Sequence, residues 1–208
     1  MNITYARLAD TRTRIVADLT SRRARGAYRV IDVGGEGAGW TRSVIDALVD
    51  IRGDDPVFTF DICSRSAWEP LLIYVKQHGL FDYAICTHTL EDLYDPCVTL
   101  DLLPRIACSG VVTCPSLRTE FSRHENKAWL GNIHHRWLVD QEDGALLLAP
   151  KLGFLEQFKG LDIREEAYEI VFEWSEHLPW RMVSNNYFEH SDQIYEIYNE
   201  LIARAQRL

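Results

Sequence analysis

Residues 28–39 read Tyr28-Arg29-Val30-Ile31-Asp32-Val33-Gly34-Gly35-Glu36-Gly37-Ala38-Gly39. The first six residues form a β-prone run, which predicts a buried strand, and the glycines that follow predict a tight turn. Apolar residues then recur at helical spacing from Val44 to Val49, so we expect a helix after the turn. Strand, glycine turn and helix together indicate an α/β fold that binds a ligand at this turn.

An acidic residue, Asp61, closes the next predicted strand, which covers residues 57–62. Such an acid can accept hydrogen bonds from both ribose hydroxyls of an adenosine, while a turn without Cβ atoms lets the backbone approach the ligand closely. The predicted helix would begin near Ala38 or Trp40 and point its free N–H groups at the same ligand. The sequence therefore predicts nucleoside binding. Because the carboxylate of Asp32 would repel a pyrophosphate, it favours a cationic ligand over a dinucleotide.

Strands and helices continue to alternate along the chain. We expect helices up to about Arg23, over 68–78, from Thr89 with an interruption at Pro96, and over the final segment from Ser191. We expect further strands at 81–86, 110–114, 145–149, 169–174 and 180–183, the last two paired as an antiparallel hairpin. The predicted fold class is α/β: a doubly wound, mainly parallel Rossmann-like sheet with helices on both faces and this late antiparallel hairpin.

Length and composition predict a single domain over residues 1–208, in which the polar and aromatic segment 116–137 forms a lid or cap. The formal net charge of −9 argues against nucleic-acid partners, because a phosphate backbone needs a basic surface. The longest apolar runs are far too short to cross a bilayer, and the N-terminus shows no signal pattern. We therefore expect a cytoplasmic protein without a membrane partner, and the sequence leaves its oligomeric state open.

Two segments resemble class I S-adenosylmethionine-dependent methyltransferases. Residues 30–37 are similar to the family's first motif, hydrophobic-Asp-x-Gly-x-Gly-x-Gly. Residues 81–96, FDYAICTHTLEDLYDP, are similar to the segment that runs from the family's fourth strand into its helix, FDxVxxxHxLEHxxDP. The chain departs from the family at Glu36, where a glycine is usual, and it leaves little room between Asp61 and Asp82 for the family's third strand.

The resemblance implies that S-adenosyl-L-methionine is the cofactor and that its methyl group passes to an acceptor. It implies a role for each matching residue: Asp32, Gly34, Gly35 and Gly37 around the methionine part, Asp61 at the ribose, Ile62 beside the adenine, and Thr87 and His88 facing the sulfonium from the acceptor side.

Methyl transfer needs alignment of donor and acceptor and removal of a proton, so a histidine is the expected base. His88 is one candidate, and His134 and His135 are the others. The last two lie in the run Ile133-His134-His135-Arg136-Trp137, which is similar to one in bacterial methyltransferase-like proteins of undefined substrate. Adjacent side chains on an extended segment point in opposite directions, so we expect one of this pair in the site.

Four neighbouring side chains are candidates for binding the acceptor: Arg136, Trp137, Trp129 and Glu120. An arginine can clamp a carboxylate or phosphate, and tryptophans can wall an apolar or sugar face. An open alternative is that the histidines and aromatics hold the lid through buried hydrogen bonds. A metal site is another alternative, drawn from His134, His135, Glu120 or His124, but its spacing matches no known motif and we assign no metal.

The hypothesis from sequence is an S-adenosylmethionine-dependent methyltransferase that acts on an oxygen or nitrogen of a small polar metabolite or sugar-like acceptor. One alternative is a non-catalytic methyltransferase-like protein that binds partners. A nicotinamide-dependent oxidoreductase on a related fold is disfavoured, since the sequence holds no Tyr-x-x-x-Lys pair.

Overall fold

The computed structural model describes residues 2–35, 39–52, 58–183 and 191–208. Its strands and α-helices are, in chain order, β1 (Asn2–Ala6), α1 (Leu8–Arg25), β2 (Val30–Val33), β3 (Ala47–Asp50), β4 (Phe58–Thr59), α2 (Glu69–His78), β5 (Tyr83–Thr87), α3 (Pro96–Ile106), β6 (Ser109–Pro115), α4 (Leu117–Glu120), β7 (Trp137–Glu142), β8 (Ala145–Pro150), β9 (Glu169–Ser175), β10 (Trp180–Met182) and α5 (Ser191–Arg207).

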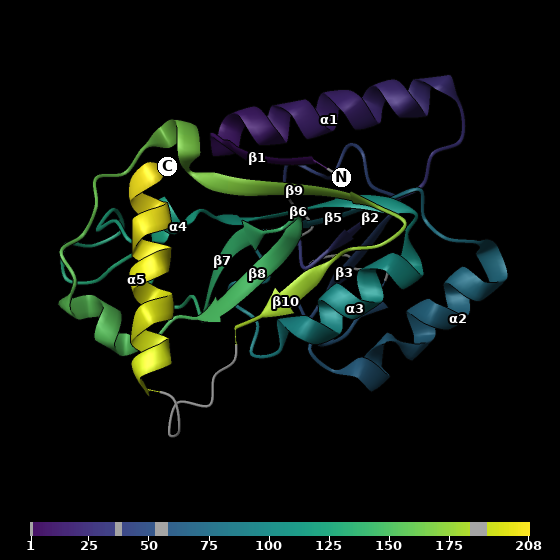
Figure 1. The fold of residues 1–208 in the computed structure, drawn as a ribbon. Helices are drawn as coiled ribbons and strands as arrows, with labels where there is room; N and C mark the ends of the chain where they lie inside the picture. The colour runs from purple at the N-terminus through teal and green to yellow at the C-terminus, as the bar shows by residue number, and fades with distance from the viewer. Residues whose placement is uncertain (1, 36–38, 53–57, 184–190) are drawn as a thin grey trace.

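The central sheet has seven strands in the order β1-β9-β6-β5-β2-β3-β4. The five strands from β6 to β4 run parallel, and β9 is antiparallel to both β6 and β1. Alternate side chains enter opposite faces, so Val30 packs with α1 residues while Ile31 belongs to the core that includes α2 and α3. Figure 1 shows α1 on one side of the sheet and α2 and α3 on the other. The predicted α/β sheet with helices on both faces is confirmed.

The helix predicted after the glycine turn is wrong. Residues 47–50 form β3, which pairs in parallel with β2 through Ile31 and Ala47. The described residues 39–46 before it form turns, in which the N–H of Arg42 donates to the carbonyl of Gly39 and that of Val44 donates to the carbonyl of Thr41. A strand covered on both faces is apolar at every position, and this short run satisfied helical spacing as well.

Two strand pairings differ from expectation. The N-terminal stretch, predicted to be helical, begins with β1, which pairs with β9. The predicted hairpin between 169–174 and 180–183 is wrong as well, because β10 runs parallel to β8 in a separate three-stranded sheet, β10-β8-β7. The antiparallel hairpin is β7–β8, joined by Asp143 and Gly144 with φ of 50° and 77°. Positive φ at both residues fits the twist of a two-residue hairpin turn.

The helix expected from Thr89 begins instead at Pro96. Asp95 caps it, accepting a hydrogen bond of 3.1 Å from the N–H of Cys97. Proline suits this first turn because its missing N–H has no partner to lose there. Residues 88–94 are therefore a loop at the carboxyl end of β5.

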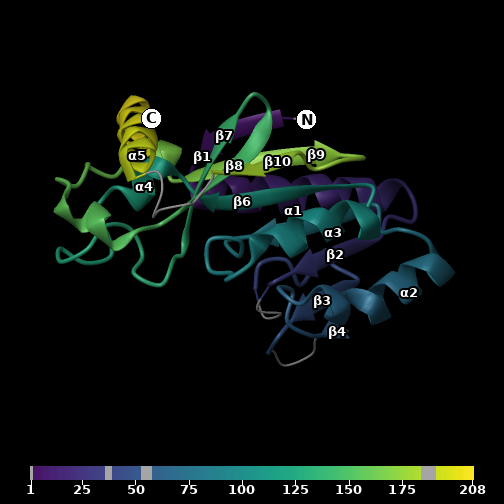
Figure 2. The same ribbon diagram turned by 60° about the horizontal axis from the view of Figure 1, so that its bottom comes forward.

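A second hydrophobic core lies between α5, α4 and the small sheet. It buries Leu117 and Phe121 against Tyr198 and Leu201 of α5 and against Leu138 of β7. The first part of the segment expected to be a lid is therefore packed inside the protein. Figure 2 shows α5 and α4 beside each other at one end of the central sheet.

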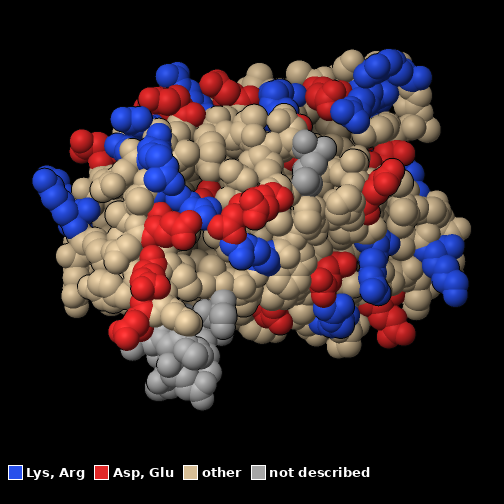
Figure 3. Space-filling view, viewed as in Figure 1, with Lys and Arg blue, Asp and Glu red and all other residues tan. Residues whose placement is uncertain are grey.

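The surface carries both charge types. On the face shown in Figure 3, lysine and arginine side chains are interspersed with aspartate and glutamate. Among the described residues, the helices all fall short of the length and apolarity that a membrane span needs.

Candidate active site

A cavity of about 870 Å³ opens at the carboxyl ends of β2, β3 and β5. Three strand ends and the loops after them supply its wall, as expected for an open parallel sheet. Its lining includes most of the residues expected at the cofactor: Asp32, Gly34, Gly35, Asp61, Ile62 and Thr87. His88 and Arg136 also line it, and Gly37 lies outside the described residues.

Asp32 is the buried acid at the base of this cavity, with 2% of its surface exposed. One carboxylate oxygen, Oδ2, accepts a hydrogen bond of 2.6 Å from the hydroxyl of Thr41. The other oxygen, Oδ1, has no partner among the described residues. Burial raises the pKa of Asp32 to about 6, although the hydrogen bond from Thr41 opposes this rise. A buried carboxylate with a free oxygen favours a ligand that donates hydrogen bonds or carries positive charge.

The glycine turn is packed too tightly for side chains. Gly34 has φ of +82°, and a Cβ there would lie 2.3 Å from Cγ2 of Thr89. A Cβ on Gly35 would lie 2.3 Å from Oδ2 of Asp32. The N–H of Gly34 donates to the carbonyl of Val49 at 2.8 Å, which joins the turn to β3. Glycine is thus required where the backbone passes between the acid and the Thr89 loop.

The acid that ends the strand beside β2 is Asp50, which the sequence analysis did not select. β3 lies between β2 and β4, so Asp61 belongs to the next strand position outward. Both acids line the cavity together with Phe60 and Ile62. Asp61 also accepts a hydrogen bond of 2.9 Å from the N–H of Cys63. The missed signal was an acid directly after an apolar run, hidden because that run was interpreted as a helix.

His88 sits at the rim of the cavity with φ of +50°. Its Nε2 lies 2.8 Å from Glu169 and its Nδ1 lies 3.4 Å from Glu91. Burial opposes protonation of the ring, but the two glutamates outweigh it and raise the pKa of His88 to about 9. The imidazole is therefore a cation at neutral pH, which makes it a poor proton acceptor.

His134 and His135 lie on a turn, not on an extended segment, and their rings meet at 4.5 Å between centroids. The expectation that they point in opposite directions is wrong. Both reach Asp92, whose Oδ1 is 3.6 Å from Nε2 of His134 and 3.9 Å from Nε2 of His135. Asp92 lines the cavity, whereas the two histidines are outside its lining.

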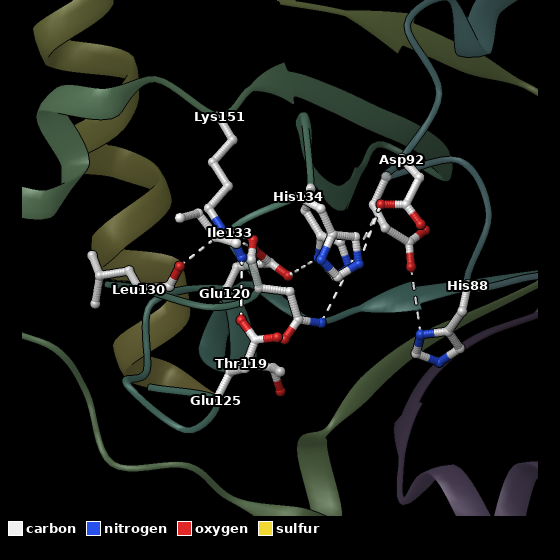
Figure 4. A network of polar contacts seen from close by, with 12 residues as sticks. His88, Asp92, Thr119, Glu120, Glu125, Leu130, Ile133, His134 and Lys151 are labelled. Carbon is white, nitrogen blue, oxygen red and sulfur yellow. Dashed lines mark hydrogen bonds and ion pairs between the residues drawn. The ribbon is translucent and has the colours of Figure 1, made fainter. Parts of the chain in front are cut away.

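Glu120 holds the imidazole of His135 in place through its Nδ1 atom. Its Nδ1 is 2.6 Å from Oε1 of Glu120, and Lys151 donates to Oε2 of the same carboxylate at 2.6 Å. Lys151 also donates to the carbonyls of Leu130 and Asn132. Burial lowers the pKa of His135, but Glu120 outweighs it, and the pKa is raised. Figure 4 shows Lys151 reaching toward Glu120 and His134 facing Asp92.

The other residues expected to bind an acceptor separate into two groups. Arg136 lines the cavity. Trp137 is outside the lining and donates from Nε1 to the carbonyl of Leu93 at 2.7 Å, while Trp129 donates to Glu125 at 2.8 Å. Glu120 is likewise outside the lining, in its buried contacts with His135 and Lys151. For these three, the geometry favours the alternative of side chains that hold the segment in place.

Comparison with solved structures gives matches of low sequence identity. The chain matches no family model and no curated protein. Among solved structures, the methyltransferase domain of bacterial CtHen1 is 12% identical and covers 79% of this chain and 97% of its own, with a TM-score of 0.39. A second structure of that domain is 11% identical over 80% and 98%, with a TM-score of 0.38. A candidate methyltransferase of Bacillus halodurans C-125, BH2331, is 10% identical over 77% and 99%, with a TM-score of 0.31. Similarity this low carries no functional argument.

Proposed function

We propose that this protein is an S-adenosylmethionine-dependent methyltransferase. The observation that carries the proposal is the free oxygen of Asp32, which is buried beside a glycine turn at the base of the cavity. The ammonium group of the methionine part of the donor matches this oxygen in charge and in hydrogen bonding. Gly34 and Gly35 pack against the side chains of Thr89 and Asp32 without a Cβ, so the backbone of the turn itself lines the cavity.

The outer part of the cavity suits an adenosine. Asp50 and Asp61 offer carboxylates that can accept hydrogen bonds from ribose hydroxyls and from the adenine amino group. Phe60, Ile51 and Ile62 offer apolar surface against which a purine can pack. The residues that line the cavity therefore fit the methyl donor at both ends.

The same geometry speaks against a dinucleotide. A dinucleotide-binding fold places the pyrophosphate at the N-terminus of the helix that follows the glycine turn. In the described residues 39–46, turns stand in place of that helix, and Asp32 sets a negative charge at the turn. A nicotinamide-dependent oxidoreductase is therefore the weaker hypothesis.

The acceptor side of the proposal is a small polar molecule that enters beside Asp92 and Arg136, both on the cavity wall. The bound donor supplies an activated methyl group. This chain's residues must align the acceptor oxygen or nitrogen and receive its proton. His134 and His135 stay the candidate bases through their contact with Asp92, whereas His88, already protonated and paired with Glu91 and Glu169, is not available as a base. With a net charge of −9, a small-molecule acceptor is favoured over a nucleic acid.

Isothermal titration with S-adenosylmethionine, its demethylated product and NAD tests the donor assignment. We expect one site per chain for the first two ligands and no heat with NAD. Absence of heat with both sulfur nucleosides at millimolar concentration contradicts the proposal. Binding without release of demethylated product, across a panel of small hydroxyl and amino compounds, supports the non-catalytic alternative instead.

A further inference from the structure

Three side chains beside the cavity have the composition of a metal site. Asp92, His134 and His135 present ligand atoms that all lie within 4.8 Å of one another. The Asp92 oxygen is 3.6 Å from one imidazole nitrogen and 3.9 Å from the other. Donors about 2.1 Å from an ion are about 3.4 Å apart in a tetrahedron, so shifts of about 1 Å complete the site. We propose that these three residues bind a divalent transition-metal ion.

The orientation of His135 supports this role. Its Nδ1 is held by Glu120 at 2.6 Å, and Lys151 fixes the far oxygen of that carboxylate. A carboxylate that binds the outer nitrogen of an imidazole orients the inner nitrogen toward a metal and raises its basicity. The inner nitrogen, Nε2, contacts Asn132 Nδ2 at 3.1 Å, and the ion replaces this contact.

The charge around the site supports a cation. Glu91, which precedes Asp92, is 1% exposed, and neither of its carboxylate oxygens has a hydrogen-bond partner among the described residues. The imidazole of His88 forms an ion pair with Glu91 at 3.4 Å and a second ion pair with Glu169 at 2.8 Å. A divalent ion at Asp92 adds positive charge beside this buried acid, which shares its ion-pair partner His88 with Glu169.

The backbone holds the two ligand-bearing segments together. The N–H groups of Arg136 and Trp137 donate to the carbonyl of Glu91 at 2.6 and 3.2 Å. On the far side of Asp92, the indole of Trp137 donates to the carbonyl of Leu93. Asp92 is thus bracketed by contacts to the segment that carries both histidines. Preorganisation of this kind lowers the cost of gathering ligands that lie far apart in sequence.

Two imidazoles and one carboxylate favour zinc, manganese, iron or cobalt over magnesium and calcium, which prefer oxygen ligands. Because Asp92 lines the cavity, an oxygen of a molecule bound there can complete the coordination. This last step rests on the proposed function. It favours an acceptor that is methylated on oxygen, since a metal lowers the pKa of a bound hydroxyl. The two histidines then serve as metal ligands, and proton removal falls to the medium.

Titration of chelator-treated protein with CoCl₂, followed by visible absorption, tests the site, with ZnCl₂ and MgCl₂ as competitors. We expect one cobalt ion per chain, displaced by zinc but not by magnesium. His134→Ala and Asp92→Asn should each weaken binding at least about tenfold. The imidazole of His134 is 59% exposed, so its removal leaves the fold intact. His177→Ala and Asp162→Asn alter exposed residues elsewhere and serve as matched controls.

Two results overturn the proposal: no binding by the unaltered protein at millimolar cobalt, or undiminished binding by both His134→Ala and Asp92→Asn. The titration contains no methyl donor, so its failure is separate from failure of the proposed function. His134→Ala should bind S-adenosylmethionine as the unaltered protein does. Loss of metal with retention of donor binding in that variant is the outcome that the proposal requires.

Discussion

The Cβ position of Gly35 lies 2.3 Å from Oδ2 of Asp32, the same oxygen that accepts the hydrogen bond from Thr41. A methyl group cannot share this space with a carboxylate, so the position of the Asp32 side chain requires a glycine at position 35. A glycine at position 35 leaves room for the carboxylate of Asp32, which lines the cavity.

Gly35→Ala should therefore displace Asp32 and weaken binding of S-adenosylmethionine at least about tenfold, since the charged contact between acid and ammonium is lost. Gly153→Ala is the matched control, because a Cβ on Gly153 meets no atom within 4 Å and Gly153 is outside the cavity lining. Titration calorimetry gives the affinities, and far-ultraviolet circular dichroism checks the fold. Equal affinity in the two variants contradicts the role assigned to Asp32.

The pKa of Asp32, raised by burial to about 6, predicts a pH dependence of donor binding. The anionic form binds the ammonium, so affinity should fall about tenfold per pH unit below this pKa. The folding stability of the donor-free protein depends on pH in the opposite direction. The contribution of protonated Asp32 is fully present below pH 3.8 and is lost as pH rises through about 6. Asp32→Asn should bind the donor weakly and without this pH dependence. If the variant keeps the pH dependence of donor binding, another group causes it.

Asp50→Asn should weaken donor binding about tenfold, because a carboxylate accepts hydrogen bonds from ribose hydroxyls more strongly than an amide does. Asp162→Asn, at an exposed position outside the cavity, should leave the affinity unchanged. Competition between S-adenosylhomocysteine and its fragments adenosine and homocysteine locates the effect. A loss confined to adenosine-containing ligands is expected, and a loss for homocysteine alone argues against the ribose contact.

His88 predicts a stability change in mildly alkaline solution. The pKa of its imidazole is raised in the folded state to about 9, so the stabilisation is fully present below pH 6.5 and is lost as pH rises through about 9. The whole contribution is at most about 3 kcal/mol. Urea unfolding at pH 6.5 and 9.5 should show a larger fall in the unfolding free energy for the unaltered protein than for His88→Asn. Asparagine tolerates the positive φ at this position.

His78→Asn is the matched control for that comparison, since His78 is an exposed histidine at the end of α2. It should show the same alkaline fall as the unaltered protein. If His88→Asn shows that fall too, the pair of glutamates around His88 does not hold a proton there.

Lys151→Met should lower the unfolding free energy by about 3–5 kcal/mol, because it breaks a buried ion pair and leaves Glu120 with His135 as its remaining charged partner. Glu120 and Lys151 expose 1% and 8% of their side chains. Lys127→Met, at an exposed position, should change stability by less than about 0.5 kcal/mol. Adding Glu120→Gln to Lys151→Met should restore part of the loss, and a further loss instead shows that the pair is not coupled.

The fold class and the position of the cavity were predictable from local sequence. β2 and β5 are short apolar runs that end in glycine or polar residues, and α1 and α2 show helical spacing closed by Gly26 and Gly79. Such signals depend on residues that are close together in the sequence, so they can be interpreted without knowledge of the tertiary structure.

The errors occurred where partners distant in sequence decide the outcome. Burial on both faces makes Ala47–Asp50 a strand, and no local pattern separates it from a helix turn, so Asp50 was overlooked. His134 and His135 were oriented by assuming an extended backbone, whereas a turn closed by the N–H of His135 and the carbonyl of Asn132 brings both to Asp92. Site geometry of this kind depends on the packing of one loop on another and cannot be predicted from the spacing of residues in the sequence.

The pairing of β1 with β9 joins Asn2 to Glu173 in one ladder. A ribosome that is making this chain exports β1 long before β9 exists, so β1 cannot pair with β9 until the residues between the two strands have been synthesised. Closure of the central sheet is therefore a late event of biogenesis. A nascent chain stalled before β9 would present an open sheet edge to chaperones or to other nascent chains.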